Sequence, residues 1–171
     1  MAALPVITYG EPILRKVLEI VEDFDAIKDL VPDMFDTMYE EEGIGLAASQ
    51  IGVDLNLMII DISHADQNHP PAAYVNGQII DQSGSISLEE GCLSIPEVRV
   101  DVTRSEKVIF AYQDLGGNHH EAEFDDLMAT VIQHEMDHLD GILFVDHLSP
   151  VRRSIILRKL AKAKKQALQP T

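Results

Sequence analysis

The stretch from Phe124 to Gly141, FDDLMATVIQHEMDHLDG, leaves the chain little structural freedom, because its H-E-x-x-H pattern has a chemical use only on a helix. His134 and His138 are four residues apart, so an α-helix places both imidazoles on one face, where they can bind one metal ion. Glu135 follows the first histidine, and its carboxylate can reach a water on that metal without being a ligand. The pattern therefore predicts a helix with a catalytic metal site. A core helix with two hydrogen-bonded histidines is the weaker interpretation.

The residues around this pattern indicate where the helix begins and ends. Asp125 or Asp126 is expected to cap the N-terminus, and Gly141 is expected to stop the helix. Between them, Leu127 and Val131 recur with the histidines at the 3.6-residue period of a helix with one apolar face.

Charge is distributed unevenly along the 171 residues. The segment before Pro150 contains six Lys and Arg against 29 Asp and Glu, a formal charge of −23, whereas seven cations and no carboxylate follow Pro150. The acidic segment repels polyanions, so any contact with nucleic acid would be made by the C-terminal segment, and DNA is not an expected partner.

The compartment is indicated by cysteine usage and by the apolar runs. The single cysteine, Cys92, cannot form an internal disulfide, which fits a reducing compartment. The N-terminus has no apolar signal region, and no apolar run approaches the roughly 20 residues that span a bilayer. We expect a cytoplasmic protein with no membrane partner.

The middle of the chain predicts antiparallel sheet. Leu55–Ile62 is a β-rich run typical of a buried strand, and Val98, Val100 and Val102 alternate with polar residues. A hairpin is predicted from two further runs, 107–113 and 119–124, which flank the turn sequence DLGGN.

Helical patterns flank this sheet. Apolar residues from Ile27 to Met38 follow a helical period that Pro32 interrupts, either by a kink or by starting a new helix. Ser149 and Pro150 start a basic C-terminal helix, expected over 150–168. The chain is therefore expected to be one α+β domain over 1–171, with antiparallel sheets around the helix that carries HEMDH.

A catalytic metal site commonly has three protein ligands, so a third is needed beside the two histidines. The candidates are Cys92, Glu89, Glu90 and the carboxylates after the helix. A thiolate is the most distinctive of these, and it lies in a glycine-containing bend between strands. A buried apolar cysteine is the alternative.

Residues 43–50, GIGLAASQ, combine two glycines and several small residues with one amide, Gln50. We interpret this segment either as a loop whose backbone contacts a ligand or as a tight turn into a strand.

Three stretches, GIGLAASQ (43–50), EGCLS (90–94) and QHEMDHLDG (133–141), resemble in order and spacing the three signature motifs of the bacterial-type peptide deformylase family. The resemblance also includes PILRKV and DMFDTMYEEEG, so it covers most of the chain. It implies an α+β hydrolase that removes the N-formyl group from the N-terminal formylmethionine of newly synthesised proteins. It also implies one divalent metal ion per chain, with ferrous iron favoured, although a Cys/His/His set accepts zinc, nickel or cobalt as well.

The resemblance assigns roles to individual residues. The implied metal ligands are Cys92, His134 and His138. Glu135 is implied to act as general base and then as general acid in the attack of a metal-bound water on the formyl carbon. The Gln50 side-chain amide and the Leu93 backbone N–H are implied to form the oxyanion hole.

The implied substrate is an N-formylmethionyl nascent peptide. The residues implied to line its methionine pocket are Ile44, Leu88, Leu127, Thr130 and Val131, of which Thr130 is less apolar than expected. Gly45, Gly91 and Arg99 are implied to lie near the peptide backbone. Because formylated chains emerge from the ribosome, contact with ribosomal RNA is one interpretation of the basic C-terminal helix, and a solvated face is the other. The chain departs from the family at Val75-Asn76-Gly77, where members usually have proline after asparagine.

Three other functions fit parts of the pattern. A zinc peptidase also uses H-E-x-x-H, but such sites usually complete their ligand set with histidine or a carboxylate, not with Cys92. A cysteine hydrolase would use Cys92 as nucleophile and would be insensitive to chelators. A catalytically inactive relative would keep the metal for stability only, which the complete set of expected catalytic residues disfavours.

Overall fold

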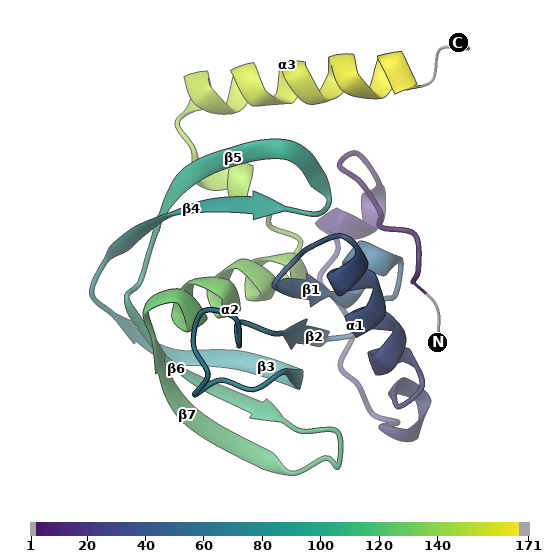
Figure 1. The fold of residues 1–171 in the computed structure, drawn as a ribbon, viewed down its shortest axis with the longest axis vertical. Helices are drawn as coiled ribbons and strands as arrows, with labels where there is room; N and C mark the ends of the chain where they lie inside the picture. The colour runs from purple at the N-terminus through teal and green to yellow at the C-terminus, as the bar shows by residue number, and fades with distance from the viewer. Residues whose placement is uncertain (1–2, 168–171) are drawn as a thin grey trace.

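A central helix lies between two antiparallel sheets in the computed structural model, which describes residues 3–167 (Figure 1). The α-helices are α1 (Leu30–Glu40), α2 (Asp126–Leu139) and α3 (Pro150–Ala167). The strands are β1 (Gly45–Ala47), β2 (Leu57–Ile60), β3 (Ala72–Ser83), β4 (Ile86–Cys92), β5 (Ile95–Arg104), β6 (Lys107–Gln113) and β7 (His119–Asp125). Short 3-10 helices are η1 (Pro12–Arg15), η2 (Asp25–Ile27), η3 (Ala48–Ile51) and η4 (Phe144–His147). The α+β class expected from the sequence is confirmed.

The strands form two separate sheets with different surroundings. One has five strands in the order β1-β2-β3-β6-β7, and the other is the β4–β5 hairpin, whose strands pair over Ile86–Arg104. In Figure 1, α2 crosses the centre of the molecule between the β4–β5 hairpin and the larger sheet. The apolar face of α2, including Met128 and Ile132, packs into the core cluster of the larger sheet. A second cluster, with Phe144 and Ile95, lies beneath the hairpin.

The predicted helix around H-E-x-x-H is observed with small differences at its start. Asp125 occupies the N-cap position with extended backbone, but its side chain makes no capping hydrogen bond. At the other end the helix stops at Leu139, and the chain turns through Gly141 at φ +75°. A Cβ at that position would lie 2.4 Å from the backbone oxygen of Arg15, so the close approach of the N-terminal segment requires glycine.

The helix expected around Pro32 begins two residues earlier than the proline. α1 starts at Leu30, so Pro32 lies in its first turn, where a missing N–H removes no intrahelical hydrogen bond. The apolar run before it forms the short helix η2 instead of a continuous kinked helix.

Strand β3 was not predicted, because its central residues resemble a turn. Asn76 has φ +52°, and the pairing of β3 with β6 shifts register between Val75 and Gln78. The amide of Asn76 bonds to both backbone groups of Val21, and a Cβ on Gly77 would lie 2.5 Å from Cζ of Phe110. The departure from the family pattern here therefore sits in a close-packed bulge inside a long strand.

The C-terminal helix α3 attaches to the protein through a narrow apolar face. The Ser149 hydroxyl accepts a hydrogen bond from the Arg152 backbone N–H, as a capping residue does. Ile156 is buried, and Leu157 and Leu160 pack against the cluster beneath the hairpin. Figure 1 places α3 outside the β4–β5 hairpin. The expected final residue of this helix, Leu168, lies outside the described residues, and none of the described helices is long and apolar enough to cross a membrane.

Candidate active site

Helix α2 presents three polar side chains at the centre of the protein. His134, Glu135 and His138 are 8%, 3% and 1% exposed. The ring centroids of the two histidines are 5.0 Å apart, as the i, i+4 spacing on a helix requires. Burial of three titratable groups within five residues opposes folding, so their environment must supply compensating interactions.

Cys92 is brought to these histidines from a different sheet. It is the last residue of β4, immediately before the Leu93–Ser94 turn of the hairpin, and its Sγ lies 3.3 Å from Nε2 of His138. One donor atom each from Cys92, His134 and His138 lies within 4.8 Å of the other two. The other candidates for third ligand have different partners. Glu89 is exposed and pairs with Arg99, and Glu90 contacts Nδ1 of His134 at 2.8 Å.

The environment of this cluster shifts the pKa values of its two histidines in opposite directions. Burial acts to lower the pKa of His134, but hydrogen bonds to Cys92 and Glu90 outweigh burial and raise the pKa to about 10. Burial and the neighbouring His134 hold the pKa of His138 well below its usual range. One thiolate and two imidazoles form a donor set that suits zinc, iron, cobalt or nickel. The residues therefore fit a divalent metal ion.

The carboxylate of Glu135 lies beside this cluster without belonging to it. Its Oε1 is 3.9 Å from Nε2 of His134, and its Oε2 is buried without a hydrogen-bond partner in the structure. Burial raises the pKa of Glu135 to about 7, although the nearby His134 acts to lower it. A pKa near neutrality suits a group that must both accept and donate a proton. A Cβ on Gly45 would lie 2.8 Å from Oε1, so the glycine of β1 gives the carboxylate its space.

The amide of Gln50 is fixed in orientation beside Cys92. Its Oε1 accepts a hydrogen bond from the Ala47 backbone N–H at 2.9 Å. This leaves the NH2 group to donate to Ser94 Oγ at 3.2 Å and toward Cys92 Sγ at 3.6 Å. The segment 43–50 contains strand β1 and most of the 3-10 helix η3. This backbone path agrees with a turn into a strand, the second of the two interpretations given for the segment. Its glycines and amide nevertheless border the site.

Leu93, the other expected oxyanion donor, lies in the hairpin turn next to Cys92. Its side chain packs against Gly43, where a Cβ would lie 2.9 Å from Leu93 Cδ1. The first and second motifs are therefore in direct contact beside the metal-binding cluster.

A buried ionic network behind the histidines was missed by the sequence interpretation. Arg104 donates to both carboxylate oxygens of Glu90, at 2.6 and 2.9 Å, and to Asp137 Oδ2 at 2.9 Å. Nε2 of His147 lies 2.7 Å from the same oxygen of Asp137. The available signal was the alternation of β5, because Arg104 continues the inward-facing positions of Val100 and Val102. A cation at such a position needs a buried partner.

The residues expected to bind substrate lie on α2, on three strands and just before β1. On α2, Leu127 is half-buried, whereas Thr130 and Val131 are buried. The Thr130 hydroxyl donates to the Asp126 backbone oxygen at 3.1 Å, which satisfies the polar group within the helix and leaves the methyl group for apolar contacts.

Of the remaining expected substrate residues, Ile44 immediately precedes β1, and the others lie on β1, β4 and β5. Ile44 packs against the hydrophobic core of the larger sheet. Leu88 on β4 belongs to neither of the two hydrophobic core clusters found among the described residues. Gly91 and Arg99 are cross-strand partners in the hairpin, and a Cβ on Gly91 would lie 3.0 Å from a guanidinium nitrogen of Arg99.

Comparisons with known proteins agree on one family. The family model for polypeptide deformylase matches residues 3–154. The chain is 41% identical to the peptide deformylase of Stenotrophomonas maltophilia strain K279a, over 96% of this chain and 98% of that protein. It is 45% identical to peptide deformylase 2 of Xanthomonas axonopodis pv. citri over the same shares of the two chains. The crystal structure of a peptide deformylase from Legionella pneumophila superposes with a TM-score of 0.89 at 42% identity, over 98% of this chain and 99% of that one. A peptide deformylase from Ehrlichia chaffeensis in complex with actinonin matches with a TM-score of 0.89 at 32% identity, over 95% and 98%.

Proposed function

This chain belongs to the polypeptide deformylase family, whose members remove the N-formyl group from nascent peptides, and we propose a specific mechanism for it. The proposed reaction is hydrolysis of the formamide at the N-terminal formylmethionine, with Glu135 transferring the protons. The whole chain, 1–171, is proposed to act as one deformylase domain in the cytoplasm. The observation that carries the proposal is the convergence of Cys92, His134 and His138 to within 4.8 Å beside the buried carboxylate of Glu135.

Cys92, His134 and His138 are proposed to hold one divalent ion. When bound, this ion supplies Lewis acidity and lowers the pKa of a water toward neutrality. The protein determines how the ligands present their donor atoms. Glu90 accepts a hydrogen bond from Nδ1 of His134, which fixes the tautomer that leaves Nε2 free to coordinate.

Glu135 is proposed to move the proton twice. It first takes a proton from the attacking water, and it delivers that proton to the amine nitrogen as the carbon–nitrogen bond breaks, so that a neutral amine leaves. Its buried position supports both roles, because burial raises the pKa of the carboxyl to about 7. No other residue is needed as the proton donor.

Gln50 and Leu93 are proposed to stabilise the negative charge that develops on the formyl oxygen. The contact from Ala47 to Oε1 orients the Gln50 NH2 toward Cys92, and the N–H that points at Cys92 Sγ at 3.6 Å is proposed to donate to the oxyanion instead. Removing one such donor from other acyl-transfer sites costs about 2.7–4 kcal/mol of transition-state stabilisation. The Leu93 backbone N–H is proposed as the second donor because it directly follows Cys92.

The substrate is proposed to lie between β1 and the β4–β5 hairpin. The proposed lining of the methionine pocket is Ile44, Leu88, Leu127, Thr130 and Val131. Gly45 and Gly91 present backbone without side chains, which lets a peptide approach, and Arg99 is exposed at the rim of the hairpin.

Ferrous iron is the proposed native metal, and zinc, nickel or cobalt would occupy the same ligands. The test is turnover of formyl-Met-Ala-Ser by protein purified anaerobically and then loaded with each metal. Deformylation that a chelator abolishes and added metal restores supports the proposal. A chelator-insensitive activity would instead favour the cysteine hydrolase, in which Cys92 is the nucleophile.

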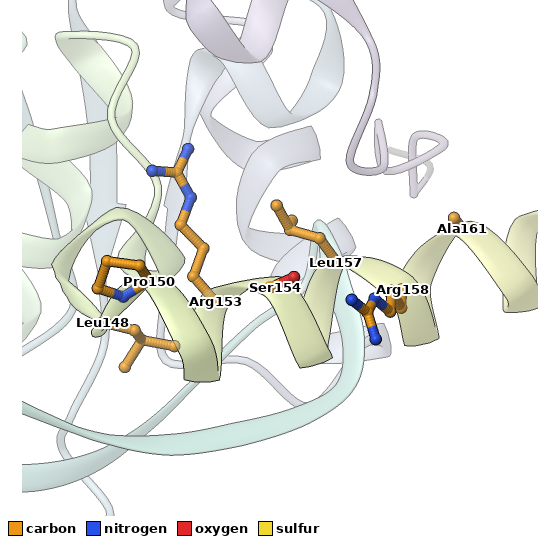
Figure 2. Close-up of a pocket in the computed structure, with 7 residues that line it drawn as sticks. All are labelled: Leu148, Pro150, Arg153, Ser154, Leu157, Arg158 and Ala161. Carbon is orange, nitrogen blue, oxygen red and sulfur yellow. The ribbon is translucent and has the colours of Figure 1, made fainter.

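The basic helix over 150–168 is proposed to contact ribosomal RNA. A groove of about 450 Å³ lies along α3, and Figure 2 shows Arg153 and Arg158 among the residues that line it. The residues that line the groove are Leu148, Pro150, Arg153, Ser154, Leu157, Arg158 and Ala161. Seven cations and no carboxylate follow Pro150, whereas the rest of the chain carries a charge of −23, so the C-terminal segment attracts phosphate and the net charge of the rest repels it.

Charge substitution tests this contact better than deletion, because deletion would uncover the apolar cluster that Ile156 helps to cover. Replacement of Arg158, Lys159 and Lys162 by Gln changes exposed residues only. The triple variant should lose salt-sensitive co-sedimentation with ribosomes and keep its turnover of a short formyl peptide. Undiminished co-sedimentation would contradict the proposed contact.

A further inference from the structure

The proposed metal ligands come from two parts of the fold that share no sheet. Among the described strands, β4 pairs with β5 in the two-stranded sheet, while α2 packs on the five-stranded sheet. Cys92 therefore belongs to a hairpin whose backbone hydrogen bonds do not fix it relative to His134 and His138. The separation of these donor atoms must be set by side-chain contacts between the hairpin and the helix.

A continuous series of ionic contacts provides this connection. From inside to outside it runs His134, Glu90, Arg104, Asp137 and His147, with contacts of 2.6 to 2.9 Å. Glu90 and Arg104 are on the hairpin, and His134 and Asp137 are on α2. Two of these contacts, His134–Glu90 and Arg104–Asp137, connect the hairpin to the helix. Both lie close to the proposed ligands in sequence, since Glu90 is two residues from Cys92 and Asp137 precedes His138.

We propose that Arg104 and Asp137 are positioning residues for the metal site, and that their ion pair sets the separation of Cys92 from the two histidines. His147 holds the Asp137 carboxylate from the outer side. The inference rests on the proposed metal site, but neither Arg104 nor Asp137 is a ligand or contacts the reacting atoms.

The geometry of Arg104 supports a positioning role. Its side chain is 5% exposed and donates through three nitrogens, Nε and Nη2 to Glu90 and Nη1 to Asp137. A planar fork that engages two carboxylates at once has a defined orientation, which a lysine ammonium group cannot reproduce. Glu90 is in turn held with its Oε1 2.8 Å from Nδ1 of His134.

The stability of this arrangement depends on all its members. Burial acts to raise the pKa of Glu90 and to lower the pKa of Arg104. Hydrogen bonds to His134 and Arg104 outweigh burial at Glu90, and contacts with Glu90 and Asp137 outweigh it at Arg104. Loss of one charge leaves another buried without its partner. The network is therefore expected to respond as one unit.

Cobalt binding by the full-length protein tests the proposal. The variants are Arg104→Lys and Asp137→Asn, measured by chelator competition for the Co2+ dissociation constant and by the near-ultraviolet thiolate-to-cobalt absorption band. The matched controls are Arg15→Lys, which alters an exposed guanidinium paired with Asp146, and His120→Gln, which alters an exposed histidine paired with Asp114. Thermal melting of the metal-free proteins measures stability separately.

Loss of a partner behind a metal ligand typically weakens metal binding by about 10–100-fold. Each network variant is expected to raise the Co2+ dissociation constant within this range and to weaken or shift the thiolate band. The Arg104→Lys/Asp137→Asn double variant should lose little more than the single variants, because both changes remove the same ion pair. The controls should stay within about threefold of the parent.

Three results would overturn the proposal. They are an unchanged dissociation constant and thiolate band in both variants, an equal loss in the Arg15→Lys control, or fully additive losses in the double variant. If Arg104→Lys fails to fold, Asp137→Asn carries the same test, since it preserves side-chain volume. A parent protein with no thiolate band at all would refute the proposed metal site instead, so the two failures are distinguishable.

Discussion

Replacement of Glu135 by glutamine should abolish nearly all deformylation while the protein keeps its metal. The change preserves side-chain volume at a position that is 3% exposed, so the helix and the contact with Gly45 should remain. The cluster of donor atoms consists of Cys92, His134 and His138, without Glu135, so the ligand set is not altered.

The expected magnitude follows from the position of the carboxylate. General acid–base catalysis typically contributes about 10²–10⁴-fold to a rate. Glu135 is proposed to transfer a proton in two steps, and the carboxylate of Glu90 is held by Arg104 and His134, so Glu90 is not arranged to replace it. We therefore expect a loss near the upper limit, about 10⁴-fold in kcat, or about 5 kcal/mol.

The assay combines metal content with turnover of formyl-Met-Ala-Ser, on protein purified anaerobically and loaded with Co2+ or Fe2+. Glu123→Gln is the matched control, because it makes the same chemical change on the exposed face of β7. The role given to Glu135 is wrong if the purified variant has less than about half of the parental metal content, or if its kcat lies within about tenfold of the parent.

Three further predictions concern the metal, the space around Glu135 and the N-terminal contact. The iron form should lose activity in air, because ferrous iron and the Cys92 thiolate are both oxidisable, and equal air-stable activity of the iron and zinc forms would contradict this. Gly45→Ala should lower kcat with little loss of metal, because its Cβ would lie 2.8 Å from Glu135 Oε1; an unchanged kcat would argue against this steric limit. Gly141→Ala should lower the free energy of unfolding by about 1–3 kcal/mol in urea denaturation, because its Cβ would lie 2.4 Å from the Arg15 backbone oxygen at φ +75°. A loss below about 0.5 kcal/mol would count against that close contact.

The sequence by itself determined the individual helices and hairpins, and it determined the part of the site that lies on a single helix. The spacing of His134 and His138 places them on one face wherever a helix forms, because the helical period is fixed by local backbone geometry. The hairpin of β6 and β7 and the capped start of α3 were predictable for the same reason. Their signals, turn residues and a capping serine, act over a few residues.

Only the tertiary structure decided which distant groups meet at the site. Cys92 approaches His138 across 46 positions of sequence, and Arg104 joins Glu90 to Asp137 between two elements that share no sheet. Sequence spacing holds no information about such contacts, because they depend on how the hairpin and the helix pack. The burial that raises the pKa of Glu135 to about 7 has the same origin, since desolvation by the surrounding fold disfavours the charged carboxylate.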